Sequence, residues 1–462
     1  MKILLVAYDS GMYMHWFPQG LAYLASVLQK KGYKVEIYNQ DKFHFPDAHL
    51  TEYLGKYKYD VIGVSVIGGY YQYRKLLKIS DAINKSKNRP FYIIGGHGPS
   101  PEPEYFLKKT QADAVVIGEG EDTIIELIET WSNHESLATV KGIAYLDGGK
   151  VVVNERRPLI RDIDKIQFPA YELFPIDYYR LFRMPNATKT DFVMPVLSGR
   201  GCTFECNFCY RMDTGFRPRS SESIIEEVRM LKKNYGITCI LFSDELLMSS
   251  VKRTINLCEA FIKAKLDIKW GCAGRLNYAK PEVLRLMKRA GCVWISYGIE
   301  ALDDRVLRNM NKALTVKQII QGIEETIKAG VPVGFNVIFG NVSDNRETLE
   351  KGVEFLLKYD DGAQMRTIRP VTPYPGSPLY YKAIQDGLLR DCEDFYENKH
   401  INSDLLSVNF TELSDEEFHL CLLEANTKLI TSYYQKKLHT EIDQTKKLYL
   451  QKDISFRGFR QS

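Results

Sequence analysis

The chain lacks any strong excess of charge. Its 62 lysines and arginines stand against 58 aspartates and glutamates, which gives a formal charge of +4 at pH 7 over 462 residues. Nucleic-acid-binding proteins usually carry a clear basic excess, so we expect no nucleic-acid partner. No apolar stretch approaches the roughly 18 residues that a membrane-spanning helix needs, so we expect no membrane span. The first apolar run ends at Asp9 and is too short for a secretory signal, which predicts a cytoplasmic protein.

Nine cysteines are present, and six of them stand alone among apolar residues. Scattered cysteines in a long chain disfavour a disulfide framework. The other three, Cys202, Cys206 and Cys209, form a C-x3-C-x2-C array between Gly199 and Tyr210. A structural zinc site would need a fourth ligand at short spacing, and no second C-x2-C or H-x3-5-H pair follows. The array therefore predicts one inorganic centre that keeps an open coordination position.

Short apolar runs alternate with amphipathic segments over residues 1–135, in a chain long enough for two or three domains. The predicted strands are Lys2–Ala7, Lys34–Tyr38, Asp60–Val66, Phe91–Ile94 and Asp113–Ile117. The predicted helices are Gln19–Lys31, Tyr71–Asn84, Glu102–Lys109 and Glu121–Ser132. This alternation predicts an α/β domain with a doubly wound parallel sheet. No G-x-G-x-x-G follows the first strand, which disfavours a nicotinamide or flavin site.

Glycine-rich loops follow the strands of this domain, where such sheets bind ligands. Glycines let a large flat ligand lie against the backbone. The candidate ligand-binding residues in these loops are Gly20, Gly68, Gly69, Gly96, His97, Gly118, Glu119 and Gly120.

We expect residues 136–190 to form a connector. It should contain a hairpin of Gly142–Tyr145 and Val151–Val153, and the prolines that follow should break regular structure. Strand–helix alternation then resumes over 191–400. Its predicted strands are Phe192–Ser198, Thr238–Asp244, Ile268–Arg275, Val293–Glu300, Pro332–Gly340 and Met365–Val371. Its predicted helices are Ser223–Asn234, Val251–Ala264, Pro281–Ala290, Val316–Ala329 and Arg346–Tyr359. Beyond 400 we expect a helical segment: an amphipathic helix, Ser414–Leu429, and then a lysine-rich helix and tail from Lys436.

Charged residues stand at the ends of the second, third and fourth strands of this region: Asp244 and Glu245, Arg275, and Glu300. Active groups of barrels lie at strand carboxyl ends. Buried charges are costly unless something pairs with them, so a zwitterionic ligand would suit these positions. The bland alternatives are an ion pair for Arg275 and a helix N-cap before Leu246 for Asp244.

The array C-x3-C-x-aromatic-C, with Phe208 as its aromatic residue, resembles the motif of the radical S-adenosylmethionine (radical SAM) enzymes. The resemblance implies an open partial (β/α)6 barrel and a 4Fe–4S cluster on the three cysteines. It implies that the cluster's unique iron chelates SAM, which one electron cleaves to methionine and a 5′-deoxyadenosyl radical. That electron would come from a donor such as a flavodoxin or ferredoxin.

The same resemblance assigns roles around SAM. Phe208 would pack near the adenine, and Asp244 or Glu245 would take the amine. Arg275 would take the carboxylate and Glu300 the ribose hydroxyls. The segment from Gly298 to Leu307 closely resembles the family stretch after the fourth strand.

The amino-terminal region resembles the cobalamin-binding domain that precedes the barrel in one large class of radical SAM enzymes. The resemblance rests on Pro18–Ala25, Gly95–Pro99 and Gly118–Glu121. The D-x-H-x-x-G sequence of other cobalamin proteins is absent, and Asp41–His44 has the wrong spacing. The resemblance thus implies cobalamin bound without a protein imidazole below the cobalt. His97 is the nearest candidate for a corrin contact, and a loop histidine bonded to backbone is its alternative.

The expected function is methylation of an unactivated carbon in a small-molecule substrate that lies between the two domains. Residues 373–378 (PYPGSP) resemble the anaerobic porphyrin cyclase branch equally well, so radical cyclisation or oxidative rearrangement stays open. A non-catalytic carrier of a cluster or corrinoid is the third possibility, and the charged groups at strand ends disfavour it.

Overall fold

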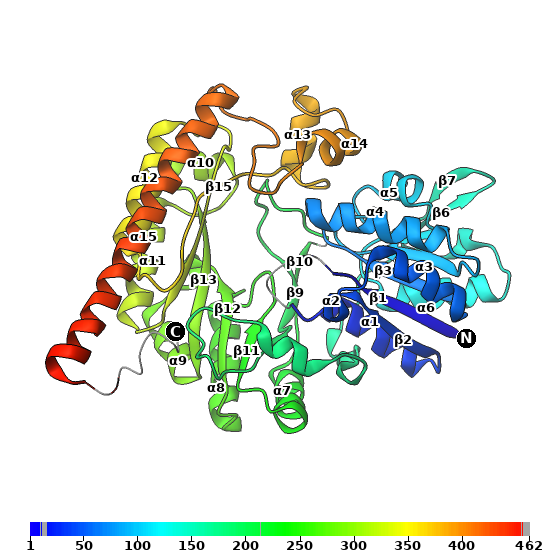
Figure 1. Cartoon of the computed structure of the whole chain (residues 1–462), viewed down its shortest axis with the longest axis horizontal. Helices are drawn as coiled ribbons and strands as arrows, with labels where there is room; N and C mark the ends of the chain where they lie inside the picture. Colours follow the sequence, from blue (N-terminus) through cyan, green and yellow to red (C-terminus); the bar gives the residue numbers. More distant parts are fainter. Residues whose placement is uncertain (10, 12–15, 213, 454, 456–462) are drawn as a thin grey trace.

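The computed structural model describes residues 1–9, 11, 16–212, 214–453 and 455. Two mainly parallel sheets, each covered by helices, form an amino-terminal lobe and a barrel lobe, at the right and left of Figure 1. One buried apolar cluster joins the lobes, since it includes Leu5 and Ala22 of the first and Met194 and Ile240 of the second. The lobes therefore share a core.

The amino-terminal lobe is built on a seven-stranded sheet. Its strands are β1 (Lys2–Ala7), β2 (Lys34–Asn39), β3 (Val61–Ser65), β4 (Phe91–Gly95), β5 (Ala114–Val116), β6 (Ile143–Asp147) and β7 (Lys150–Val153). Its helices are α1 (Gln19–Lys30), α2 (Gln40–Phe43), α3 (Asp47–Lys56), α4 (Tyr70–Asn84), α5 (Pro103–Thr110) and α6 (Glu121–Ser132). The order β2-β1-β3-β4-β5, all parallel, confirms the predicted doubly wound sheet.

Two features of this lobe go beyond the prediction. The hairpin β6–β7 was expected, but it also pairs antiparallel with β5 and so extends the sheet. Helix α3 was not expected because it buries only Leu50 and Leu54, which is too little apolar periodicity to detect. After β7 the chain runs to the barrel through short 3-10 turns, and Tyr171 in one of them stacks on Phe17 with ring centroids 5.2 Å apart.

The barrel lobe has a six-stranded sheet in the order β15-β14-β13-β12-β11-β8. Its strands are β8 (Val193–Val196), β11 (Cys239–Phe242), β12 (Lys269–Gly274), β13 (Cys292–Glu300), β14 (Val333–Phe339) and β15 (Arg369–Pro370). The surrounding helices are α7 (Ser221–Tyr235), α8 (Val251–Ala264), α9 (Pro281–Arg289), α10 (Asp304–Asn309), α11 (Val316–Lys328) and α12 (Arg346–Tyr359). All neighbouring pairs are parallel, which confirms the open partial barrel.

A two-stranded antiparallel ribbon, β9 (Gly199–Cys202) and β10 (Gly215–Pro218), follows the first barrel strand. It was not predicted, because neither segment shows the alternation or the β-branched residues of a strand. The ribbon places Cys202 opposite Gly215. The cysteine array therefore begins at the end of a strand rather than in an unsupported loop.

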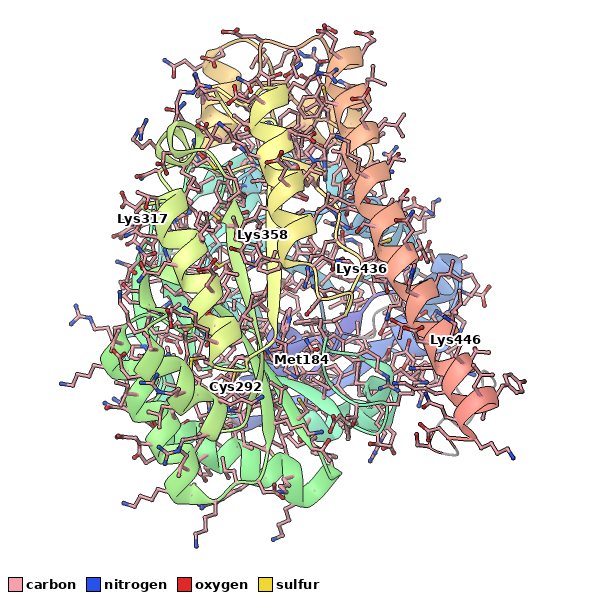
Figure 2. All side chains as sticks on the ribbon, turned by 90° about the vertical axis from the view of Figure 1, so that its left-hand side faces the viewer. Met184, Cys292, Lys317, Lys358, Lys436 and Lys446 are labelled. Carbon is pink, nitrogen blue, oxygen red and sulfur yellow. The ribbon has the colours of Figure 1, made fainter. Side chains whose placement is uncertain are left out.

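The carboxyl-terminal part crosses back toward the first lobe and then returns. Helices α13 (Pro378–Gln385) and α14 (Cys392–Asp394) lie near the amino-terminal lobe at the top of Figure 1, where Tyr396 stacks on Tyr73 at 4.4 Å. Helix α15 (Asp415–Gln451) then runs beside α12 (Figure 2).

The predicted capping box at the start of α15 is confirmed: Ser414 accepts from Glu417 N, and the Glu417 carboxylate accepts from Ser414 N. The prediction of a separate lysine-rich helix was wrong, because a single helix of 37 residues spans the region. The domain borders at 135, 190 and 400 stay predictions. In the described part of the chain, no helix combines the length and the apolar character of a membrane span.

Candidate cluster and cofactor site

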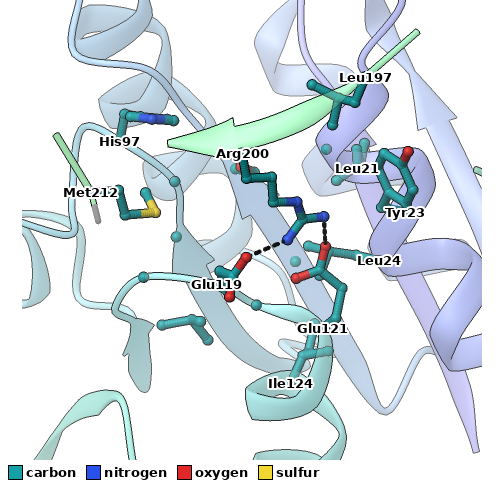
Figure 3. Close-up of a pocket in the computed structure, with 18 of the residues that line it drawn as sticks. Leu21, Tyr23, Leu24, His97, Glu119, Glu121, Ile124, Leu197, Arg200 and Met212 are labelled. Atoms are coloured by element: carbon teal, nitrogen blue, oxygen red, sulfur yellow. Dashed lines mark hydrogen bonds and ion pairs between the residues drawn. The ribbon is translucent and has the colours of Figure 1, made fainter. Parts of the chain in front are cut away.

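Two adjoining cavities lie between the carboxyl edges of the two sheets. The larger has a volume of about 820 Å³ and the smaller, shown in Figure 3, about 310 Å³. His97 and Glu245 line both cavities, so the two spaces meet at these side chains. The site therefore draws on both lobes.

Every residue predicted for the site lines at least one cavity. The larger cavity is lined by Cys202, Cys206, Phe208, Cys209, Glu245, Arg275, Glu300, Gly68, Gly69 and His97. The smaller is lined by Gly20, Gly96, His97, Gly118, Glu119, Gly120, Asp244 and Glu245. The glycine loops thus do not all face one space, since Gly68 and Gly69 turn toward the cysteines.

The cysteine loop is fixed by backbone contacts. Gly201 has φ +82°, and a Cβ at this position would lie 2.4 Å from the carbonyl oxygen of Gly215, so only glycine fits. Asn207 N–H donates to the carbonyl oxygen of Met310 (3.0 Å), and Leu379 N–H donates to the carbonyl oxygen of Asn207 (2.8 Å). The loop is therefore held between the end of α10 and the start of α13.

The three thiols suit a four-iron cluster. All three are unpaired and line the larger cavity. A four-iron cluster takes each cysteine on a different iron, so three unpaired thiols on one cavity fit it. Burial raises the pKa of the Cys202 thiol, and burial and the Cys206 thiol raise that of Cys209, so cluster binding must release protons.

Arg275 lies beside the thiols. Its Nη1 is 4.0 Å from Cys206 Sγ, and its Nε donates to Asn277 Oδ1 (2.9 Å). The guanidinium also lies over the Phe204 ring, 3.3 Å from its centroid, and donates to the carbonyl oxygen of Lys312. None of these partners carries a carboxylate. The positive charge therefore remains available to an anionic group in the cavity.

Glu300 and Lys312 form a buried ion pair at the wall of the larger cavity. Lys312 Nζ lies 2.8 Å from Glu300 Oε1, and the side chains are 7% and 10% exposed. Glu300 has φ +69° at a bulge where β13 pairs with β14, which redirects its side chain. The Lys312 ammonium is 5.7 Å from the Phe208 ring centroid. Sequence reasoning missed Lys312, because only the return of the chain after α10 brings it to Glu300.

Asp244 and Glu245 have different roles. The buried Asp244 carboxylate accepts hydrogen bonds from Ser198 N (2.5 Å), Gly199 N (3.3 Å) and Ser198 Oγ, so it supports the start of β9. Burial raises its pKa, although the Ser198 hydrogen bonds oppose this. The alternative that Asp244 caps a helix is wrong, because the next helix begins at Val251 and Ser250 caps it. Glu245 is the exposed member of the pair.

An ion cluster at the smaller cavity ties the lobes together. Arg200 Nη1 donates to Glu119 Oε1 (2.7 Å) and its Nη2 to Glu121 Oε1 (2.5 Å), as Figure 3 shows. Arg217 Nη1 lies 2.9 Å from both Glu119 oxygens, and Ile160 N–H donates to Glu119 Oε2 (2.9 Å). Burial opposes ionisation, but the Arg200 hydrogen bond holds the pKa of Glu119 below its usual value. Glu119, predicted as a ligand contact, thus anchors the β9–β10 ribbon.

The rest of the smaller cavity is mostly backbone and apolar side chains. A Cβ at Gly96, whose φ is +97°, would lie 2.4 Å from the carbonyl oxygen of Val66. Leu24, Ile93 and Ile124 add apolar walls. This lining offers backbone and apolar contacts to one part of a large, partly apolar ligand such as a corrinoid. Burial lowers the pKa of His97, whose ring meets that of Tyr210 edge to face at 6.1 Å.

Comparison with known proteins agrees with this geometry. The model of the radical SAM superfamily matches residues 196–356, and the model of the B12 binding domain matches residues 10–128. An uncharacterised methyltransferase of Pyrococcus horikoshii is 32% identical over 377 residues, which cover 80% of this chain and 79% of that protein.

Two further proteins are similar to this chain. The anaerobic magnesium-protoporphyrin IX monomethyl ester cyclase of Cereibacter sphaeroides is 27% identical over 406 residues, 84% of this chain but only 62% of that protein. The radical SAM methyltransferase TsrM of Kitasatospora setae, solved with cobalamin and a 4Fe–4S cluster, has the same fold, with a TM-score of 0.73 and 17% identity over 92% of this chain and 88% of that one.

The predicted family, fold and cofactor set are thereby confirmed. The chain belongs to the cobalamin-dependent methyltransferase family of the radical SAM superfamily, whose cofactors are a 4Fe–4S cluster, SAM and cobalamin.

Proposed function

We propose that this enzyme transfers a methyl group to an unactivated carbon of a small-molecule substrate. The observation that carries the proposal is the meeting of the two cavities at His97 and Glu245. When bound, the cofactors supply reductive cleavage of SAM, abstraction of a hydrogen atom and delivery of the methyl group. The protein contributes binding, orientation and exclusion of water.

The larger cavity would hold the cluster and SAM. Cys202, Cys206 and Cys209 would bind three irons. Arg275 would pair with the carboxylate of SAM, because its other partners leave its charge unneutralised. Glu245 would accept a hydrogen bond from the amine of SAM, since the Asp244 carboxylate already accepts hydrogen bonds from Ser198 and Gly199.

The adenosine part of SAM would lie on the opposite wall. Glu300 would accept from the ribose hydroxyls while Lys312 holds the carboxylate in place. Phe208 would pack against the adenine. A buried carboxylate is costly without a partner, and the ammonium of Lys312 supplies that partner before any ligand arrives.

Cobalamin would lie against the glycine loops. Gly20, Gly96, Gly118 and Gly120 would let it approach backbone, and Leu24 and Ile124 would cover its apolar parts. His97 would contact the corrin as a neutral ring, because burial lowers its pKa. The substrate would occupy the rest of the larger cavity, whose wall includes Gly68 and Tyr374.

Radical cyclisation or oxidative rearrangement is the second candidate. The cyclase of C. sphaeroides is 27% identical to this chain, and two residues of the PYPGSP stretch, Tyr374 and Pro375, line the larger cavity. The test is product analysis. A methyltransferase forms both S-adenosylhomocysteine and 5′-deoxyadenosine with its substrate, whereas a cyclase does not need to form the former.

The first experiment is reductive cleavage of SAM by protein reconstituted anoxically with iron and sulfide. Reduced flavodoxin or ferredoxin should support it, since we propose such a donor in a reducing cytoplasmic setting that suits nine unpaired thiols. Formation of 5′-deoxyadenosine supports the enzyme. A protein that binds iron and corrinoid but never cleaves SAM would be a carrier, and the proposed function would fail.

A further inference from the structure

A hollow of about 510 Å³ lies on the barrel lobe between the starts of α7 and α8, and is named here the outer hollow. Cys202 and Phe204 line the larger cavity, whereas Thr203, the residue between them, lines the outer hollow. The cysteine loop therefore separates the two spaces. The outer hollow brings the protein surface to the residue that follows the first proposed cluster ligand.

The outer hollow is basic. Its lining includes three basic side chains, Arg219, Lys252 and Arg253, and, among the residues that the structure describes, no carboxylate. Arg219 is neutralised by a buried ion pair with Glu227. Lys252 is exposed, and Arg253 donates to the carbonyl oxygen of Ser198 (2.6 Å). Neither Lys252 nor Arg253 forms an ion pair in the described part of the chain, so both leave positive charge at the hollow.

The start of α8 adds to this positive charge. The amino-terminal end of a helix dipole is positive and favours acidic residues in the first turn. The first turn of α8 contains Lys252 and Arg253 and no acidic residue. The buried Asp244 lies close enough to act on the charge of Arg253, but Lys252 points into solvent. An anionic surface placed here would compensate both the helix dipole and the exposed lysine.

The other flank of the cysteine loop has no such character. Glu205 is exposed there, and its carbonyl oxygen accepts from Asn311 Nδ2 (2.9 Å) just after α10. Arg308 is also exposed, at the end of α10, so this flank carries both signs of charge. Charge complementarity selects partners and steers their encounter. An acidic partner that must approach the cysteine loop is therefore better matched by the outer hollow.

We propose that the outer hollow is the docking face for an acidic one-electron carrier protein, such as a flavodoxin or ferredoxin. One electron would pass from the reduced carrier to the cluster site across the cysteine loop. The carrier is oxidised by one electron, the cluster is reduced by one, and no atom is transferred. Electron-transfer encounters bury small interfaces, so a compact charged face is sufficient. The inference rests on the proposed function, because reductive cleavage of SAM is what requires this electron.

Charge reversal at Lys252 tests the docking face with two readouts. Binding of an acidic flavodoxin to the reconstituted full chain is measured by calorimetry at low salt. Formation of 5′-deoxyadenosine is measured with reduced flavodoxin and, separately, with dithionite. Lys252→Glu should weaken flavodoxin binding and slow the flavodoxin-driven reaction, each by about fivefold or more, because a rim charge steers the encounter. Dithionite needs no docking face, so the reaction that it drives should not change.

Two further variants complete the test. Lys263→Glu is the matched control, because Lys263 is exposed in the last turn of the same helix and the change in net charge is equal. Asn256→Glu adds an acidic group to the exposed lining of the outer hollow and should act like Lys252→Glu. An acidic residue in the first turn favours a helix, so Lys252→Glu should fold normally.

The docking face and the proposed function fail in different ways. If flavodoxin binding and the flavodoxin-driven reaction were the same in the Lys252 and Lys263 variants, the docking face would be refuted while dithionite-driven cleavage upheld the enzyme. A wild type that cleaves no SAM even with dithionite would refute the proposed function. Flavodoxin binding to the Lys252 and Asn256 variants would then decide the docking face without any activity.

Discussion

The two cavities use charged residues in opposite ways. In the smaller cavity, Glu119 and Glu121 form ion pairs with Arg200 and Arg217, so these charges connect the two lobes. In the larger, Arg275 keeps its charge without a carboxylate partner among the described residues. A charged residue after a strand can thus be a ligand contact or a structural anchor. Only its distant partners decide which.

The largest expected effect belongs to the larger cavity. Cys209→Ala should abolish SAM cleavage, by at least about 1000-fold, because the nearby charged groups cannot replace a cluster ligand. Bound iron and 5′-deoxyadenosine are measured after anoxic reconstitution. Cys421→Ala, which changes a buried cysteine of α15, should keep both. Full activity of the Cys209 variant would refute the cluster site.

The second largest effect is expected at the ion cluster of Arg200 with Glu119 and Glu121, which joins the lobes. Arg200→Met leaves Glu119 and Glu121 buried with fewer partners, and loss of one member of a buried ion pair typically costs about 3–5 kcal/mol of stability. Denaturant unfolding measures the loss. Arg346→Met is the control, since Arg346 pairs with the exposed Glu424 at the surface and should change stability by less than about 1 kcal/mol.

The ion pair of the larger cavity should affect ligand affinity as well as folding. Lys312→Met removes the cation that holds the Glu300 carboxylate in place, so the proposed hydrogen bonds from the ribose hydroxyls to that carboxylate should be lost. Hydrogen bonds to a charged group contribute about 1.5–3 kcal/mol, which corresponds to roughly 10–150-fold weaker SAM binding. Equilibrium binding of SAM to reconstituted protein is the measurement. Lys328→Met, which removes an exposed ion pair, should bind SAM normally. If the Lys312 variant lost stability but bound SAM with unchanged affinity, Lys312 would have a structural role like that of Arg200 and no role in binding SAM.

The smallest effect is the pH dependence of the anchor. The folded pKa of Glu119 lies below its ordinary value of 4.5, so its ionised form stabilises the fold above that pH. This contribution should fade as the pH falls below about 4.5. The difference in unfolding free energy between wild type and Glu119→Gln should therefore shrink with acidification. A difference that grows instead would mean that the carboxyl is protonated in the folded state.

Sequence alone located the alternating strands, the open barrel and the lining of the cavities, because each depends on local periodicity or on one short motif. It could not assign Glu119, whose partners Arg200 and Arg217 lie far along the chain. Lys312 was not predicted for the same reason. The β9–β10 ribbon and helix α3 were not predicted because their segments carry weak apolar patterns.

The position of Arg200 in β9 has one more consequence. It stands two residues before Cys202 and holds the loop that contains Gly118 and Gly120. The strand that leads into the metal ligands is thus rigidly tied to the wall of the neighbouring compartment. Filling one compartment should order the other, and by thermodynamic reciprocity each cofactor should then be retained more tightly when its companion is already in place.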